Sequence, residues 1–217
     1  MTKKKIGKRQ QPKVSLVHEE MTMDEIWHHE GYIERASFNG GSLAGSEDDR
    51  LTFDDVVFKN VSFSSGEFRS AEFVDVIFET CDFSNVHFQN AVFYRCEFRN
   101  SKLTGADFAN SKIRHTLFND CDGKYINFSF SGMQEVDYAT CNLTDGDFYE
   151  CKLKEVRFSM CKLENVNFSE TDLKGIDLSD STYERIEVSL ANIAGCIVSQ
   201  EQAIGFARVL GLKVKEN

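Results

Sequence analysis

Residues 51–100 read LTFDDVVFKN VSFSSGEFRS AEFVDVIFET CDFSNVHFQN AVFYRCEFRN, with a phenylalanine at every fifth position from Phe53 to Phe98. The same phase continues with large apolar residues to Val198, giving 30 successive repeats of five that are interrupted only at Gly123. A period of five matches neither the helical period of 3.6 nor the strand period of 2. The chain is therefore built from short internal repeats, and these repeats decide its fold.

A second inward position lies two residues before each large residue, and it holds a small or β-branched side chain, as at Val56, Ala71 and Cys96. Two inward positions in every five residues require the chain to turn a corner about every five residues. The large side chains would fill the axis, and the small ones would let the neighbouring side approach. Successive coils would then stack by strand-like hydrogen bonds about 4.8 Å apart. We therefore expect a solenoid in which each coil buries its side chains against adjacent coils.

The triplets Ala106–Asp107–Phe108, Val166–Asn167–Phe168 and Thr171–Asp172–Leu173 follow the pattern A(D/N)L, and on these residues the chain resembles the pentapeptide-repeat proteins. The resemblance implies an all-β fold, a right-handed quadrilateral β-helix in which each side of a coil takes one repeat. It covers residues 51–198, which would make about 7.5 coils and a rod about 36 Å long. We expect three parts: a basic mobile tail and N-terminal cap over 1–30, the β-helix over 31–198, and a C-terminal helix and tail over 199–217.

The region before the repeats carries two signals. Residues 1–13 contain six Lys or Arg and no acid, which is typical of a mobile tail. Trp27 is expected to act as a lid over the first coil, because an open solenoid end exposes apolar side chains. Ser46–Arg50 is expected to form an irregular loop, since Asp48 falls where a core residue belongs.

The C-terminal region has the pattern of a short amphipathic helix. Ser199 can cap its start together with Gln202, and Gly211 can end it. A helix this short is not stable alone, so it must lie on the last coil or on a second copy of the chain. The resemblance implies a homodimer through this end. The apolar positions of the helix are Ala203, Phe206, Ala207 and Leu210.

The sequence shows no chemistry of an enzyme. The seven cysteines share one slot, two before the large residue; a straight ladder of thiols does not converge on a metal, and buried cysteine behaves as a small apolar residue. A filled rod offers no concave pocket, so we expect no catalysis, cofactor or metal.

The start of the chain lacks the apolar segment of a signal peptide, and no apolar run is long enough to span a membrane. We therefore expect a cytoplasmic protein that does not contact membranes.

Acidic residues are the main feature of the outward positions. Residues 51–198 carry 24 acids against 14 Lys or Arg, with −5 over 51–94, +2 over 95–124 and −7 over 125–198. Superposing the sequence on itself coil by coil gathers acids on one side of the early coils and on another side of the later coils. Such charge either serves solubility alone or meets a basic partner. The two sets are Asp54, Asp55, Glu72 and Asp75, and Asp147, Glu150, Glu170 and Glu187.

Two further expectations concern the outer surface. Direct nucleic-acid binding is not expected, because only the tail and the 95–124 stretch are basic. An apolar set lies near one corner of the N-terminal half, where it is either covered by Val14–Trp27 or available to another protein. This apolar set consists of Val57, Val74, Ile77, Val92 and Tyr94.

Size, uninterrupted coils, acidic surface and a C-terminal helix resemble the Qnr-like branch of the pentapeptide-repeat family. This resemblance implies a DNA mimic that binds DNA gyrase or topoisomerase IV and modulates the enzyme or protects it against quinolones. Qnr-like proteins often carry loops that interrupt the coils, and residues 51–198 leave no room for one, so protection and inhibition remain alternative expectations. The alternative function is a non-enzymatic protein–protein interaction scaffold without DNA mimicry, which would use the apolar set.

Overall fold

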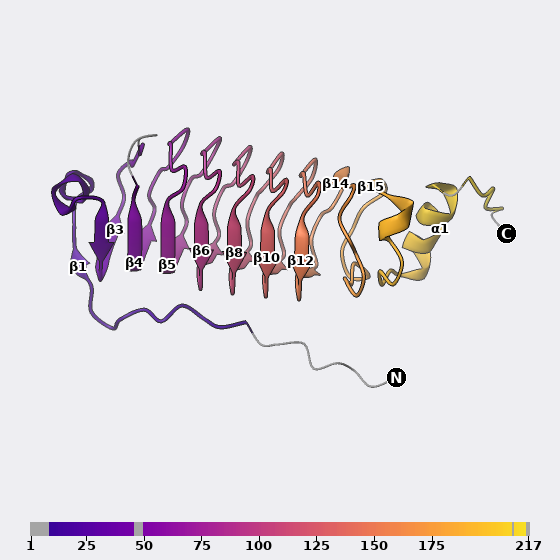
Figure 1. Ribbon diagram of the computed structural model, residues 1–217, viewed down its shortest axis with the longest axis horizontal. Coiled ribbons are helices and arrows are strands. Elements are labelled where there is room, and N and C mark those ends of the chain that lie inside the picture. Colours follow the sequence, from indigo (N-terminus) through magenta and orange to yellow (C-terminus); the bar gives the residue numbers. More distant parts are fainter. Residues whose placement is uncertain (1–8, 46–49, 210, 216–217) are drawn as a thin grey trace.

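The computed structural model describes residues 9–45, 50–209 and 211–215. The lysine-rich start, most of the expected Ser46–Arg50 loop, and Leu210 lie outside the described residues. The chain forms a β-solenoid of about eight turns with a short C-terminal helix (Figure 1). The predicted right-handed quadrilateral β-helix is confirmed.

The elements are short because the chain turns a corner every few residues. The helices are the 3₁₀ helices η1 (Met23–His29) and η2 (Leu190–Asn192) and the α-helix α1 (Gln200–Val209). The strands are β1 (Glu19–Glu20), β2 (Tyr32–Glu34), β3 (Ala36–Asn39), β4 (Thr52–Lys59), β5 (Glu72–Glu79), β6 (Val92–Tyr94), β7 (Glu97–Arg99), β8 (Lys112–Arg114), β9 (Leu117–Asn119), β10 (Gly132–Gln134), β11 (Asp137–Ala139), β12 (Lys152–Lys154), β13 (Arg157–Ser159), β14 (Val166–Phe168) and β15 (Ile186–Val188).

Each strand of the regular coils pairs in parallel with the strand one coil further along the chain, as Phe53 pairs with Phe73 and Phe73 with Phe93. Strands β4 and β5 bend round a corner and serve two sides of the rod. After them, β6, β8, β10 and β12 form one side, and β7, β9, β11 and β13 form the next. The other two sides are joined by isolated parallel bridges between turns with the same offset, as between Ser62 and Asp82. Every outward position therefore forms a straight column along the rod.

The core is a stack of aromatic rings. The ten phenylalanines from Phe53 to Phe98 are at most 1% exposed. Most rings one coil apart stack face to face, with centroids 4.7 Å apart for both Phe78–Phe98 and Phe98–Phe118, whereas Phe88 is tilted by about 40° to Phe68 and Phe108. Rings one repeat apart meet edge to face, as Phe83 meets Phe78 at 5.2 Å. Each such ring pair contributes about 0.5–1.5 kcal/mol beyond the burial of the ring itself.

The corners of the coil use a left-handed backbone. Non-glycine residues at positions 55, 60, 65 and onward to 170 have φ between 48° and 63°. Asn and Asp tolerate this conformation, but for larger residues such as Arg95, His115 and Phe130 it costs about 1–2 kcal/mol. Hydrogen bonds to the next coil offset the cost, as the N–H of Arg95 donates to the Arg114 carbonyl at 3.0 Å.

The N-terminal end of the rod is closed by η1. Ile26 is fully buried and belongs to the core, whereas Trp27 is 46% exposed. The expectation of a Trp27 lid is therefore wrong in its residue: Ile26 closes the end. The carboxylate of Glu25 fixes the start of η1 by accepting hydrogen bonds from the N–H and hydroxyl of Thr22, at 2.6 and 2.8 Å.

The C-terminal end is covered by α1. The N–H of Ser199 donates to Gln202 Oε1 at 2.8 Å, and the N–H of Gln202 donates to Ser199 Oγ at 3.2 Å, which is the expected capping pair. The side-chain amide of Gln202 then donates to the carbonyls of Leu178 and Ser181 at 2.9 and 2.8 Å. These bonds attach the start of α1 to the last regular coil. None of the described helices is long and apolar enough to span a membrane.

Candidate partner-binding surfaces

The first acidic set forms one cluster near the N-terminal end of the rod. Asp54 and Glu72 lie on the side made by the first halves of β4 and β5, and Asp55 and Asp75 occupy successive corners with φ of 55° and 54°. Burial, followed by repulsion from Asp75, raises the pKa of Asp54. The sequence brings these four acids together as expected, but their surroundings differ.

Asp55 is covered by the chain's own N-terminal segment. Residues 9–18, the N-terminal strap, return from β1 along the rod (Figure 1). The N–H of Ser15 donates to Asp55 Oδ1 at 2.8 Å, the Ser15 hydroxyl donates to Asp55 Oδ2, and His18 Nε2 lies 2.9 Å from Asp55 Oδ1. Burial alone would raise the pKa of Asp55, but the hydrogen bonds from Ser15 and His18 outweigh it and hold the pKa below its usual range.

Asp75 is held from two directions. The N–H of Lys13 in the strap donates to Asp75 Oδ1 at 2.8 Å, and the guanidinium of Arg95, one coil away, donates to both carboxylate oxygens. Asp75 is left 6% exposed, and the hydrogen bond to Asp75 raises the pKa of Arg95. A carboxylate with these partners has little capacity left for an incoming cation.

The far end of the strap crosses to the next side of the rod. Arg9 Nη2 lies 2.9 Å from Glu97 Oε1, and Arg9 Nε lies 3.6 Å from Asp137 Oδ2. The side chains of Arg9 and Glu97 are 10% and 5% exposed. Part of the segment that the sequence assigned to a mobile tail is therefore fixed by ion pairs to coils in the middle of the rod. Charge summed along the chain could not reveal this, because the partners meet only through the coil register.

The second acidic set lies on the later coils. Asp147 anchors a turn: it accepts hydrogen bonds from the N–H of Tyr149 at 2.9 Å and from the amide of Asn167, one coil on, at 3.0 Å. Glu187 follows in the same column, because Asn167 pairs with Glu187. Glu187 is exposed, and within the described ranges it makes no side-chain hydrogen bond or ion pair.

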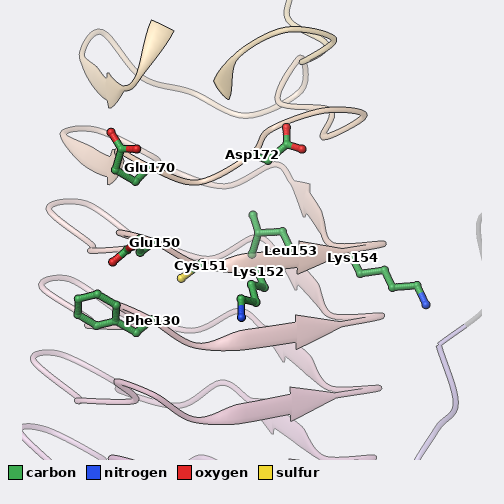
Figure 2. A pocket seen from close by; sticks show the side chains of 8 residues that line it. All are labelled: Phe130, Glu150, Cys151, Lys152, Leu153, Lys154, Glu170 and Asp172. Atoms are coloured by element: carbon green, nitrogen blue, oxygen red, sulfur yellow. The ribbon is translucent and has the colours of Figure 1, made fainter. Parts of the chain in front are cut away.

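Glu150 and Glu170 stand on successive corners of the edge beside this column, directly after Phe130 (Figure 2). Both carboxylates are exposed, and Glu170 Oε1 accepts a hydrogen bond from the Ser189 hydroxyl at 2.8 Å. The edge borders an open hollow of about 600 Å³ that Lys152 also lines. This edge is not covered by any part of the chain that the structure describes.

The apolar set is divided by a corner. Val57 and Ile77 pair across β4 and β5, and with Val14 of the strap they line a shallow hollow of about 300 Å³. The strap therefore lies over this part of the set, which is one of the two alternatives that the sequence left open.

The remaining apolar residues lie on the neighbouring side. Val74 pairs with Tyr94 across β5 and β6, and both are half-buried, as is Val92. The guanidinium of Arg95 lies 4.1 Å from the centre of the Tyr94 ring, and the His115 ring packs against it at 5.5 Å. One face of Tyr94 is thus already in use.

The C-terminal set lines a shallow apolar hollow. Phe206 and Ala207 are half-buried, and the Phe206 ring lies 6.4 Å from that of Tyr183. With Ala203 they border a hollow of about 260 Å³ between α1 and the last coil. Other large apolar side chains at this end remain 39–60% exposed: Leu190, Ile197, Ile204 and Leu212.

A family model described as "Pentapeptide repeat region" matches residues 71–135 and 131–203, which together exceed half of the chain. The chain belongs to the pentapeptide-repeat family. None of the curated protein sequences matches it.

Several solved structures are similar to this pentapeptide-repeat protein at low sequence identity. HetL of the cyanobacterium Nostoc sp. strain PCC 7120, which is involved in regulating heterocyst differentiation, is 9% identical over 82% of this chain and 91% of its own, with a TM-score of 0.40. Full-length QnrB1, a plasmid-mediated fluoroquinolone resistance protein, is 17% identical over 83% of this chain and 99% of its own, with a TM-score of 0.38. Rfr23 of the cyanobacterium Cyanothece 51142 is 11% identical over 82% and 97%, with a TM-score of 0.23.

The seven cysteines of this pentapeptide-repeat protein are free thiols. The predicted column of Cys81, Cys121, Cys141 and Cys161 is buried, and each thiol donates to a backbone carbonyl of the preceding coil, as Cys141 does to Phe118 at 3.3 Å. Burial raises the pKa of Cys81 to about 11. A buried, protonated thiol is a poor nucleophile and a poor metal ligand. In the part of the chain that the structure describes, no three His, Cys, Asp or Glu side chains are placed to hold a metal ion.

Proposed function

We propose that this protein is a non-enzymatic DNA mimic that binds DNA gyrase or topoisomerase IV through the acidic edge of its later coils and modulates or protects the enzyme in the presence of quinolones. The acidic edge is defined as the two corner residues Glu150 and Glu170 together with Asp147 and Glu187 of the column beside them. The observation that carries the proposal is that this edge is open, whereas the strap occupies the carboxylates of Asp55 and Asp75.

Charge and shape support this role. The net charge of −10 over residues 51–198 is spread along a rod of about 36 Å, or about one net negative charge per 3.6 Å. Duplex DNA carries one per about 1.7 Å, so the rod has about half of its charge density. A basic groove that steers DNA by long-range attraction would also attract such a rod, and the attraction would weaken with salt.

Charge reversal on the open edge tests the proposal. The double variant Glu150→Lys/Glu187→Lys places two cations against the basic groove, and like charges that face each other cost several kcal/mol. We expect the affinity for gyrase, measured by surface plasmon resonance at about 0.1 M salt, to fall by more than about tenfold. Asp147 and Glu170 are left intact because both hold other parts of the coil.

The matched control is Glu20→Lys/Glu201→Lys. Both residues are exposed and lie at the two ends of the molecule, so this variant changes the net charge equally without touching the edge. If the control loses as much affinity as the edge variant, binding depends on total charge only. If neither variant loses affinity, the acidic edge is not the contact.

We also propose that two copies associate through the C-terminal end. Leu212 lines the hollow under α1, and Leu190, Ile197 and Ile204 are also exposed in the C-terminal part of the chain. Burying such side chains against a second copy would remove exposed apolar surface. Sedimentation equilibrium should give a dimer that Ile204→Glu converts to a monomer. A wild-type monomer at about 100 µM protein would contradict the dimer, because association is favoured by mass action at high concentration.

The alternative function is an interaction scaffold without DNA mimicry, which would use Val74, Val92 and Tyr94. These residues are half-buried on the side of the rod formed by β5 and β6. Tyr94→Glu should then abolish partner binding while leaving the rod folded. Partner binding that Tyr94→Glu leaves unchanged would exclude these residues as the contact.

A further inference from the structure

One side of the rod carries a group of cations without carboxylate partners among the described residues. The strands β8, β10 and β12 pair in register, so that Lys112, Gly132 and Lys152 form one row and Arg114, Gln134 and Lys154 form the next. The four basic side chains are exposed and point away from the core residues between them, Ile113 and Leu153. The basic face is defined here as Lys112, Arg114, Lys152 and Lys154.

These cations differ from most others in the rod. The usual partner of a surface cation is a carboxylate one coil away, as for Lys59 with Glu79 at 3.0 Å or Arg157 with Asp137 at 2.5 Å. Within the described ranges, none of the four residues of the basic face makes an ion pair.

The four cations make no ion pair because the register places neutral residues beside them. Strand β8 pairs with Val92 and Tyr94 of β6 on the preceding coil and with Gly132 and Gln134 of β10 on the next coil, and all four residues are neutral. Strand β12 meets the same neutral β10. The one acid that follows Lys152 by a full coil, Asp172, lies outside the paired strands; it accepts a hydrogen bond from the N–H of Lys174 and lines a hollow that Lys152 also lines. The positive charge of the basic face is therefore not balanced by the strands that pair with it.

The spacing suits phosphate groups. Two coils separate the pairs of cations by about 9.6 Å, and two residues along a strand separate the members of a pair by about 6.6 Å. Between them lies a hollow of about 210 Å³ that Gly132 and Gln134 also line. A β-carbon at Gly132 would meet no atom within 4 Å, so the space between Lys112 and Lys152 is open to a ligand.

We propose that the basic face binds the phosphate backbone of a nucleic acid. This proposal does not rest on the proposed function. The basic face is the outward surface of paired strands. A peptide strand adds along the edge of a sheet, so an acidic peptide on this face would have to bind by side chains alone. Compared with an acidic peptide, a nucleic acid carries the higher density of negative charge, one per about 1.7 Å of duplex. It can therefore place several phosphates against the four cations, which lie within about 10 Å of one another. Charge summed along the chain predicts no nucleic-acid binding, whereas the register gathers cations from residues 112–114 and 152–154 on one face.

Fluorescence anisotropy with a labelled duplex of mixed sequence, about 16 base pairs long, tests the proposal on the full chain. Four phosphate contacts predict that log K falls against log salt with a slope of about −3.6. Gly132→Glu places a carboxylate among the four cations without a steric clash, and we expect it to weaken binding at about 0.1 M salt by about tenfold or more. Lys152→Gln should reduce the slope by about one.

Gly205→Glu is the matched control, because it adds the same charge on α1 where a β-carbon also meets no atom within 4 Å. Equal weakening by both glycine variants, or duplex binding that Gly132→Glu leaves unchanged, would overturn the proposal and place any binding elsewhere. Absence of binding at about 50 mM salt and about 100 µM protein, conditions that favour even non-specific association with a Kd of about 10⁻⁴ M, would also overturn it. Pyrophosphate and poly-glutamate are tested as competitors of the labelled duplex. Competition by pyrophosphate alone would overturn the proposal in favour of a small phosphate ligand. Equal competition by poly-glutamate at matched charge would overturn the proposal in favour of an acidic protein.

Discussion

The attachment of the N-terminal strap can be measured at one residue. Asp55 accepts two hydrogen bonds from Ser15 and lies 2.9 Å from His18 Nε2, and its side chain is 14% exposed. Asp55→Gly removes all three interactions, and glycine adopts the corner φ of 55° without strain. Hydrogen bonds to a charged group contribute about 1.5–3 kcal/mol each, but they are not additive and the site is partly solvated. We take about 2–3 kcal/mol for the group, which corresponds to an increase in strap opening of about 30- to 150-fold.

Amide hydrogen exchange reports this opening directly. The N–H of Ser15 should exchange about 30- to 150-fold faster in Asp55→Gly, while that of Lys13, which donates to Asp75, should change less because Arg9 still holds the far end. Asp54→Ala is the control, because Asp54 precedes Asp55 and makes no side-chain hydrogen bond to the strap in the described ranges. If Ser15 exchanges within about threefold of the wild-type rate in Asp55→Gly, the strap is not held by Asp55.

Three further predictions concern the core, the corners and pH. Phe98→Ala removes a fully buried ring stacked between two others and should lower the free energy of unfolding in urea by about 3–5 kcal/mol. Phe130→Ala, at a residue that is 52% exposed, should lower it by less than about 1 kcal/mol. Equal losses of unfolding free energy would contradict the ring stack. Met160→Asn, at an exposed corner with φ of 52°, should relieve backbone strain and stabilise the protein by about 0.5–1 kcal/mol, and an unchanged or lower Tm would argue against strain there. Because the pKa of Asp55 is lowered in the folded protein, the stabilisation that its carboxylate gives the strap is present above the unfolded pKa and is lost as pH falls through the folded pKa. Protection of the Ser15 N–H from exchange should therefore hold from about pH 7 to about pH 5 and decline below about pH 4. Protection that persists at about pH 2 would show that the charge of Asp55 is not needed.

The sequence predicts most of the rod because the repeat period is a local property. A phenylalanine every fifth residue fixes which side chains point inward, and the constant offset between coils then fixes the columns, including the buried one that begins at Cys81. The capping pair of Ser199 and Gln202 is likewise a short-range pattern, and it was predictable for the same reason.

The path of the strap could not be predicted from the sequence. Arg9, Lys13 and Ser15 belong to no repeat, and their partners lie several coils further along the chain. Only the charge of the segment hinted at an acidic partner. The expected Trp27 lid was wrong because size favours tryptophan, whereas the direction of each side chain on η1 decides which one meets the core, and that residue is Ile26.

The basic face could have been found by superposing the sequence on itself coil by coil. Lys112 and Lys152, like Arg114 and Lys154, lie two coils apart in the same column. The charge sums by segment concealed this, because they grouped Lys152 and Lys154 with the acids around them. In a solenoid, charge has to be counted by face.

The most direct test of the proposed function is gyrase supercoiling with added protein, with and without a fluoroquinolone, over a series of salt concentrations. We expect rescue from the drug, or inhibition without it, and this effect should weaken as salt rises. The effect should be lost in Glu150→Lys/Glu187→Lys and persist in Glu20→Lys/Glu201→Lys. Absence of any effect on gyrase from the same host, or an effect that the edge variant retains in full, would contradict the proposed function.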